Sequence, residues 1–203
     1  MSRLGKNPVQ LPEGVKAEFS SGVLKVFGSV GSISRIINEK MIIEITDSSI
    51  SVKPISSTRQ CNMLHGLTRG LIVNMVEGVS NGFKKELKMV GLGYKSAIKS
   101  NNELELSVGF SHLVSLGIPS CVKLSVAVDT DKNTIISIFG VDKSEVGAFA
   151  AKIRDIKRPE PYKGFGIRYT KSEISADGRT FVYTDEKIIR KSGKAAAASG
   201  GKK

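Results

Sequence analysis

The chain has 203 residues, of which 40% are hydrophobic and 25% charged, a composition that supports folded domains and excludes a globally disordered chain. No apolar run approaches the roughly 18 residues that a membrane-spanning helix needs, so we expect no membrane partner. Lysine and arginine total 31 against 19 acidic residues, giving a net charge of +12, and residues 152–203 hold 14 of these cations against 6 acidic residues. A basic end of this kind is typical of a protein that binds a polyanion such as RNA.

The N-terminal residues and the cysteines indicate the compartment. The segment 1–6 is basic but has no apolar stretch, so we expect no export or organelle-import signal. Cys61 and Cys121 form no CxxC pair, which argues against a zinc ribbon or a disulfide framework. We expect both cysteines to be small core residues in a reducing compartment.

The first eighty residues are predicted to form strands followed by one helix. Short β-rich runs predict strands at 23–27, 42–45 and 50–52. Ser57–Gln60 has the spacing of a capping box, which predicts that a helix begins there.

The buried face of this helix is predicted from its apolar spacing. Large apolar residues recur at intervals of three and four, at Leu64, Leu67, Leu71 and Met75. His65 is therefore expected on the helix surface or at an interface. Gly78 or Gly82 is a suitable place for the helix to end.

The second half repeats this plan. Strands are predicted at 85–90, 94–99, 104–110, 122–128 and 135–139. Asp142–Glu145 again has capping-box spacing, and the helix after it carries Val146, Phe149, Ala150 and Ile153 on one stripe.

The two halves match at a nearly constant offset, which indicates an internal duplication. Leu24 and Val26 lie 80 residues before Leu104 and Leu106, and the two helix starts are 85 residues apart. We therefore predict an α+β fold of two duplicated domains, each a mainly antiparallel β-sheet with one long helix packed on it. The expected domains are 1–81 and 82–173, followed by a basic extension and low-complexity tail at 174–203.

Catalytic and metal-binding patterns are weak. His65 and His112 have no cysteine or carboxylate at ligand spacing, and the acidic residues fall mostly in turns and on exposed strand faces. We expect no catalytic residue, no metal and no cofactor. His112 is predicted to lie in a turn and to contact a phosphate or ribose.

Two GxG fragments fail the context test for a dinucleotide loop. The pairs Gly91/Gly93 and Gly164/Gly166 lack the third glycine, and neither pair clearly stands between a strand and a helix. The remaining interpretations are close backbone approach to RNA or a tight turn, and for Gly91 and Gly93 we favour the turn.

The segment 158–169 is the strongest functional candidate. Two prolines and two glycines interrupt it, which predicts a loop rather than a helix. Lys157, Arg158, Lys163 and Arg168 supply cations for phosphates, while Tyr162, Phe165 and Tyr169 supply rings that stack on unpaired bases. The alternative is that Tyr162 and Tyr169 pack under the loop and hold it against the sheet; we expect at least one tyrosine to do both.

These residues resemble a known family. Arg158–Tyr169 closely resembles the signature near the end of the bacterial large-subunit ribosomal protein L-six family, and the resemblance extends from Met1 to about Glu173. The other matching segments are Ser2–Pro8, Leu11–Val15, His65–Arg69, Asn74–Phe83 and Val90–Tyr94.

The resemblance implies a structural ribosomal protein, not an enzyme. It implies two duplicated α+β domains that bind large-subunit rRNA near the sarcin–ricin loop, the stalk base and the factor-binding site. The implied setting is a bacterial ribosome, or that of an organelle that encodes the protein. There it would support assembly and translation beside neighbouring ribosomal proteins and translational GTPases.

The expected rRNA-binding residues come from the loop, the matched segments, the turn at His112 and the basic run Lys187–Lys191. They are Arg3, Lys6, Arg69, His112, Lys157, Arg158, Tyr162, Lys163, Gly164, Phe165, Gly166, Arg168, Tyr169, Arg190 and Lys191.

The sequence departs from the family pattern at three places. Phe165 stands where the family usually has lysine, Lys157-Arg158-Pro replaces Arg-Pro-Pro, and 175–185 resembles an insertion. Two other classes of protein stay open. Clustering of His112 with carboxylates would favour an RNA-modifying or RNA-cleaving enzyme, and burial of the basic loop would favour a scaffold independent of nucleic acid.

Overall fold

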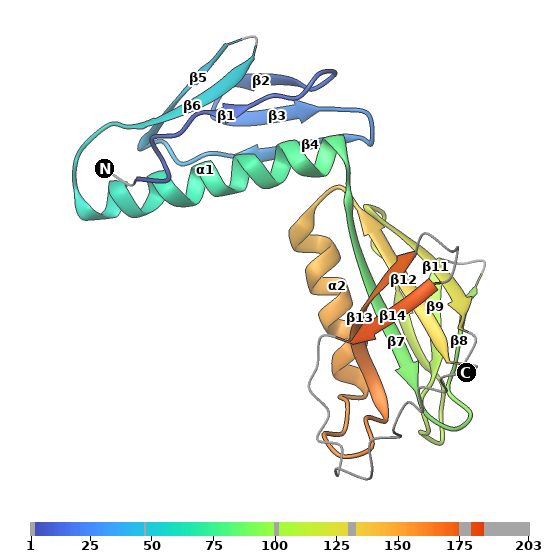
Figure 1. The fold of residues 1–203 in the computed structure, drawn as a ribbon. Helices are drawn as coiled ribbons and strands as arrows, with labels where there is room; N and C mark the ends of the chain where they lie inside the picture. The colour runs from blue at the N-terminus through green and yellow to red at the C-terminus, as the bar shows by residue number, and fades with distance from the viewer. Residues whose placement is uncertain (1–2, 47, 100–101, 130–132, 175–179, 185–203) are drawn as a thin grey trace, which may run out of the picture. The chain divides into compact units, whose positions relative to one another are not determined.

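The computed structural model describes residues 3–46, 48–99, 102–129, 133–174 and 180–184, and it shows an α+β fold (Figure 1). The chain divides into two compact units. Unit 1 takes in 1–85, 118–124 and 138–149, and unit 2 takes in 86–117, 125–137 and the residues from 150 onward. The domain boundary expected at 81/82 stays a prediction.

The first repeat contains six strands and a long helix. The strands are β1 (Val9–Gln10), β2 (Lys16–Ser20), β3 (Val23–Phe27), β4 (Ser32–Ile36), β5 (Met41–Ile45) and β6 (Ser49–Pro54), and the helix is α1 (Arg59–Ser80). The strands form two three-stranded sheets, ordered β1-β6-β5 and β2-β3-β4, and every pairing in them is antiparallel.

The second repeat follows the same order and adds two strands. Its elements are β7 (Phe83–Val90), β8 (Lys95–Lys99), β9 (Glu103–Ser107), β10 (Val114–Gly117), β11 (Val122–Val128), β12 (Thr134–Gly140), α2 (Lys143–Ile156), β13 (Gly166–Ile174) and β14 (Thr180–Thr184). The sheets are ordered β10-β9-β8 and β11-β12-β7-β13-β14.

The strand orders confirm the predicted duplication. Advancing each strand number by six converts β2-β3-β4 into β8-β9-β10 and β5-β6-β1 into β11-β12-β7. The residue pairs that suggested the repeat, Leu24/Val26 and Leu104/Leu106, are all fully buried on the central strands β3 and β9. Strands β13 and β14 have no counterpart among the described strands of the first repeat.

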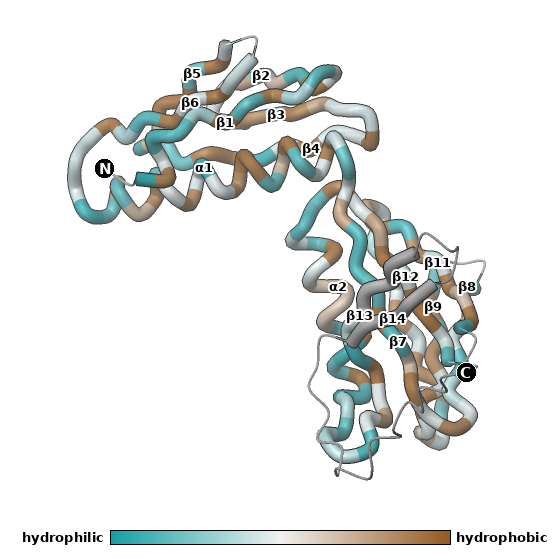
Figure 2. The backbone as a smooth tube through the Cα atoms, viewed as in Figure 1, coloured by the Kyte–Doolittle hydropathy of each residue, from teal (hydrophilic) through white to brown (hydrophobic). Residues whose placement is uncertain are grey.

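Helix α1 buries a face next to the predicted one. Its buried side chains are Cys61, His65, Thr68, Ile72, Met75, Val76 and Val79. Of the four residues predicted to be buried, Met75 is buried, Leu64 and Leu71 are half-buried, and Leu67 is 57% exposed. Figure 2 shows hydrophobic and hydrophilic residues alternating along α1.

The predicted N-cap residue is correct for one helix and wrong for the other. Thr58, not Ser57, caps α1: its hydroxyl accepts from the Cys61 amide at 3.4 Å. Asp142 precedes α2 as predicted, and its carboxylate accepts from the Ser144 amide at 2.7 Å. Helix α1 ends at Ser80, and Gly82 follows with a φ of +73°.

The expectation that His65 lies on the surface was wrong. Its side chain is 1% exposed, and its Nε2 lies 2.8 Å from the carbonyl oxygen of Val52 on β6. A Cβ at Gly5 would lie 2.6 Å from the imidazole, so the glycine lets the N-terminal segment close over the ring. A polar side chain is tolerated here because it bonds a backbone carbonyl.

The two cysteines differ. Cys61 is buried and its Sγ lies 3.1 Å from the Ser56 hydroxyl, which lowers the pKa of the thiol. Cys121 is exposed, so its predicted core position was wrong. It lies in the turn that precedes β11, not on a buried strand position.

No helix within the described residues is long and apolar enough to cross a membrane.

Candidate RNA interface

The predicted loop is shorter than expected. It runs from Lys157 to Phe165, between the end of α2 and the start of β13; we call this segment the α2–β13 loop. Residues 166–169 were predicted to belong to the loop, but they begin β13 and pair with β7. The prolines and Gly164 precede the strand, and Gly166 is its first residue, so none of them interrupts the pairing.

Backbone hydrogen bonds close the α2–β13 loop on itself. The Gly164 amide donates to the Glu160 carbonyl at 3.0 Å, and the Glu160 amide donates to the Phe165 carbonyl at 2.9 Å. At the base, the Ile167 amide donates to the Lys157 carbonyl at 2.9 Å. These bonds therefore hold the loop backbone in a defined conformation.

Gly166 allows this closure. Its φ is +131°, a conformation that L side chains rarely adopt. A Cβ there would lie 2.7 Å from both the Arg158 carbonyl oxygen and the Pro159 Cα. Gly164 also has a positive φ, +73°, so both glycines of this pair serve the turn.

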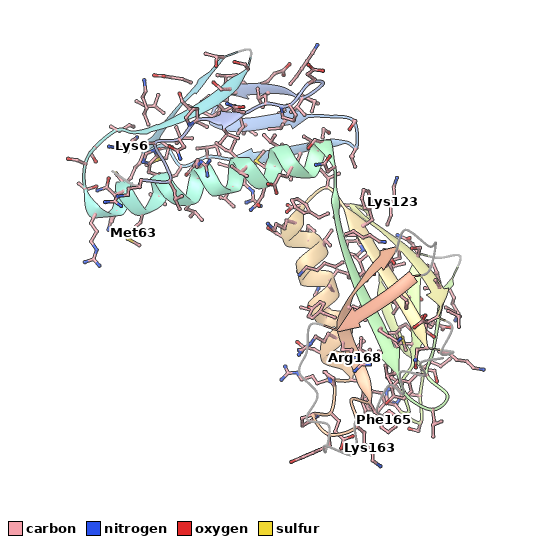
Figure 3. The ribbon with its side chains drawn as sticks, in the orientation of Figure 1. Lys6, Met63, Lys123, Lys163, Phe165 and Arg168 are labelled. Atoms are coloured by element: carbon pink, nitrogen blue, oxygen red, sulfur yellow. The ribbon has the colours of Figure 1, made fainter. Side chains whose placement is uncertain are left out.

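The side chains of the loop point outward. Tyr162 is 67% exposed and Phe165 is 40% exposed, and Arg158 and Lys163 are exposed as well. The Arg158 Nε donates to Asp155 Oδ1 at 2.9 Å, a surface pair that leaves most of the guanidinium in solvent. Figure 3 shows Lys163 and Phe165 at the same end of unit 2.

Tyr169 and Arg168 follow the loop in the chain and lie on opposite faces of β13. Tyr169 is paired with Leu87 in the β7 register and its ring lies 5.7 Å from the Arg154 Cζ, on the side of α2. Tyr169 is thus half-buried beside α2, whereas Tyr162 is exposed, so packing under the loop is wrong for Tyr162 and stays a prediction for Tyr169.

Arg168 shares its face of the sheet with a buried ion pair. Its partner in the register is Lys88, which is 6% exposed and forms an ion pair with Asp129. Arg168 is half-buried, and Figure 3 shows it farther along β13 than Phe165.

A second loop reaches the same end of the unit because Val90 pairs with Gly166. Gly91–Tyr94 forms the predicted tight turn: Gly93 has a φ of +74°, and a Cβ at Gly91 would lie 2.7 Å from the Tyr94 ring. The turn leaves Leu92 95% exposed. Sequence analysis missed Leu92, although a large apolar residue between two turn glycines was a usable signal.

A third loop, between β9 and β10, contacts the α2–β13 loop through Lys157. The Lys157 ammonium lies 5.2 Å from the centroid of the Phe110 ring, and Phe110 stacks on His112 with centroids 5.8 Å apart and planes 13° apart. His112 lies in a bend as predicted and is exposed. Sequence analysis missed Phe110, which connects the histidine to the α2–β13 loop.

The remaining candidates do not belong to this group. Arg3 and Lys6 are exposed in unit 1, where Arg69 Nε donates to the Asn7 carbonyl at 3.2 Å and holds the segment that carries them. Arg190 and Lys191 lie outside the described residues.

The geometry bears on the two competing classes. The ring next to His112 is that of Phe110, which also lies under a lysine, and this is not the carboxylate cluster that an acid–base enzyme requires. Tyr162 and Phe165 are too exposed for a loop that serves only internal packing. Within the described ranges, no group of three or more His, Cys, Asp or Glu residues could hold a metal ion.

A duplicated α+β protein with exposed cations and rings on two neighbouring loops has the features expected of a polyanion-binding class of protein. A model of the family described as ribosomal protein L6 matches residues 11–82 and 90–170, one segment in each repeat. The chain belongs to the ribosomal protein L6 family, which is structural and not enzymatic.

The chain is also similar to named members along most of its length. It is 43% identical to large ribosomal subunit protein uL6 of Geobacter sulfurreducens over 194 residues, covering 96% of this chain and 98% of that protein. It is 45% identical to uL6c of Porphyra purpurea over 169 residues, covering 83% and 91%. It is 42% identical to uL6 of Mycoplasmopsis pulmonis over 197 residues, covering 97% and 99%.

Proposed function

We propose that this protein is a structural constituent of the large ribosomal subunit, in a bacterial or organellar ribosome, and that the loop end of unit 2 binds large-subunit rRNA. The observation that carries the proposal is the α2–β13 loop, closed by its own hydrogen bonds, with Lys163, Arg158, Tyr162 and Phe165 exposed. When cationic side chains bind phosphates, condensed counterions leave the RNA, and their release favours binding. Exposed rings can stack on unpaired bases.

The other predicted residues take supporting or additional roles. Gly164 and Gly166 shape the loop, and Tyr169 and Arg168 support it from β13. Lys157 and His112 connect it to the neighbouring loop. In unit 1, Arg3 and Lys6 contribute further phosphate contacts, and Arg69 positions their segment.

We place the rRNA contacts near the sarcin–ricin loop, the stalk base and the factor-binding site. In that position neighbouring ribosomal proteins and, transiently, translational GTPases are the protein partners. Support comes from the signature in Arg158–Tyr169 and from family membership. Hydroxyl-radical footprinting of rRNA with and without the protein tests it, because protection confined to other helices would refute the placement.

The central experiment compares full-length tagged variants in sucrose gradients and in rRNA binding. The wild-type protein should sediment with the large subunit. Replacing Arg158 and Lys163 together with glutamine should weaken rRNA binding and lower the salt slope by roughly 0.7–0.9 for each phosphate that is no longer neutralised. The matched control is Lys123→Gln, which changes an exposed lysine outside the loop, on β11. It should leave the salt slope of rRNA binding nearly unchanged. Wild-type protein that stays at the top of the gradient would refute the proposal.

A further inference from the structure

The loop between β9 and β10 carries an ordered pair of exposed rings. Val108 is fully buried and anchors the loop, and Gly109 turns the chain with a φ of +78°. Phe110 is then 43% exposed, and His112 stacks on it in a nearly parallel arrangement. Exposed aromatic side chains usually sample several rotamers, so a stacked pair has given up part of its conformational entropy before any ligand binds.

A cation reaches this pair from a different element. Lys157 follows α2, and its carbonyl accepts the Ile167 amide that closes the α2–β13 loop. Its ammonium lies over the Phe110 ring, a cation–π contact that fixes the lysine beside the rings. This arrangement suits a nucleotide, because the flat base can stack on the rings and the anionic phosphate can pair with the cation.

We propose that Phe110 and His112 form a stacking platform for one unpaired base of the RNA, with the phosphate of that nucleotide near Lys157. The inference rests on the proposed function and deepens it, because it assigns the class of RNA element: an unpaired nucleotide, not the backbone of a duplex. It also changes the role expected for His112. The imidazole contributes its ring face, whereas a phosphate or ribose contact would need its N–H groups.

Two substitutions of His112 distinguish the contribution of its ring face to RNA binding from that of its hydrogen-bonding nitrogens. His112→Ala removes both, and His112→Phe keeps the ring and removes the nitrogens. Removal of a base stack costs ~1–3 kcal/mol, which is roughly a 5- to 150-fold decrease in affinity. We therefore expect His112→Ala to weaken binding by that factor and His112→Phe to stay within about twofold of wild type.

The binding probe is protein-free large-subunit rRNA from one of the bacterial relatives, measured with the full-length protein at several salt concentrations. Because stacking releases no counterions, the salt slope of His112→Ala should equal that of wild type. Leu113→Ala, a truncation of the neighbouring 59% exposed side chain, is the control for general removal of apolar surface. Chemical probing of the bound rRNA should show one unpaired base that wild type protects and His112→Ala leaves reactive.

Each outcome decides between roles. Equal decreases in affinity for His112→Ala and His112→Phe would overturn the platform in favour of a hydrogen-bonding histidine. Wild-type affinity in both would overturn any role for the ring. Either result leaves the proposed function standing if the Arg158 and Lys163 variant still binds more weakly and with a lower slope. Absence of rRNA binding by the wild-type protein would instead overturn the proposed function itself.

Discussion

Replacing Gly166 with alanine tests the backbone geometry that supports the α2–β13 loop. The new Cβ would lie 2.7 Å from the Arg158 carbonyl oxygen and the Pro159 Cα, both backbone atoms that a side-chain rotation cannot move. The φ of +131° adds strain of ~1–3 kcal/mol for a residue other than glycine, and overpacking adds ~1–3 kcal/mol. The two terms together predict that the free energy of unfolding falls by about 2–6 kcal/mol.

The measurement is urea unfolding of the full-length protein. The chain has no tryptophan, so unfolding is followed by circular dichroism rather than by tryptophan fluorescence. Hydrogen exchange at the Ile167 amide should accelerate, because its acceptor is the Lys157 carbonyl at the loop base. The matched control is Gly70→Ala in α1, where a Cβ would meet no atom within 4 Å and removing a helical glycine should stabilise by up to ~1 kcal/mol. A Gly166→Ala protein within about 0.5 kcal/mol of wild type would show that the loop does not depend on close approach at this position.

Four further predictions address the charges, the ring and the domain boundary. Arg168→Gln should leave the salt slope of rRNA binding unchanged, because Arg168 is half-buried on β13; a lower slope would restore it as a phosphate contact. Asp129→Asn should destabilise by roughly 3–5 kcal/mol, because it breaks the buried ion pair between Asp129 and Lys88, and a shift under 1 kcal/mol in urea unfolding would contradict this. Phe165→Ala should weaken rRNA binding by ~1–3 kcal/mol with unchanged unfolding, whereas reduced stability would show that the ring packs on protein, and Phe165→Lys tests whether a point charge replaces it. A fragment of residues 82–184, which retains β13 and β14, should give a dispersed amide NMR spectrum, and a collapsed spectrum would place the domain boundary elsewhere.

The duplication could be predicted from the sequence because it depends on deeply buried residues. Leu24, Val26, Leu104 and Leu106 alternate with polar neighbours on central strands, so the period-two pattern was strong. The edge strands β2 and β4 were missed because one face of each meets solvent and their composition is mixed, as in the serine-rich Ser32–Ile36.

The face of α1 could not be predicted from hydrophobicity alone. Leucines at 64, 67 and 71 outrank His65 and Thr68 in any apolar count, yet the histidine and the threonine are buried. His65 is buried on the face that also buries Ile72, Met75 and Val79, and its hydrogen-bond partner, the Val52 carbonyl on β6, is set by tertiary structure. In the same way, the composition of the candidate site was predictable, but the stacking of Phe110 on His112 depends on a loop that no local pattern specifies.

The difference between the repeats explains why the candidate interface lies in the second one. In the sheet β5-β6-β1, the edge beyond β1 is the position that β13 occupies beyond β7. The Leu11 amide donates to the carbonyl of Ser48, the residue before β6. In an antiparallel pair, alternate residues bond the neighbouring strand, so the backbone groups of Pro8, Gln10 and Pro12 point away from β6, toward the open edge. Two of these three are prolines without an N–H, and β1 has two residues, both features that block strand addition at an edge. In the first repeat the prolines and the short β1 prevent another strand from pairing at this edge. In the second repeat β13 pairs there instead. Adding β13 required a connection from α2, and that connection is the loop that presents Lys163, Tyr162 and Phe165.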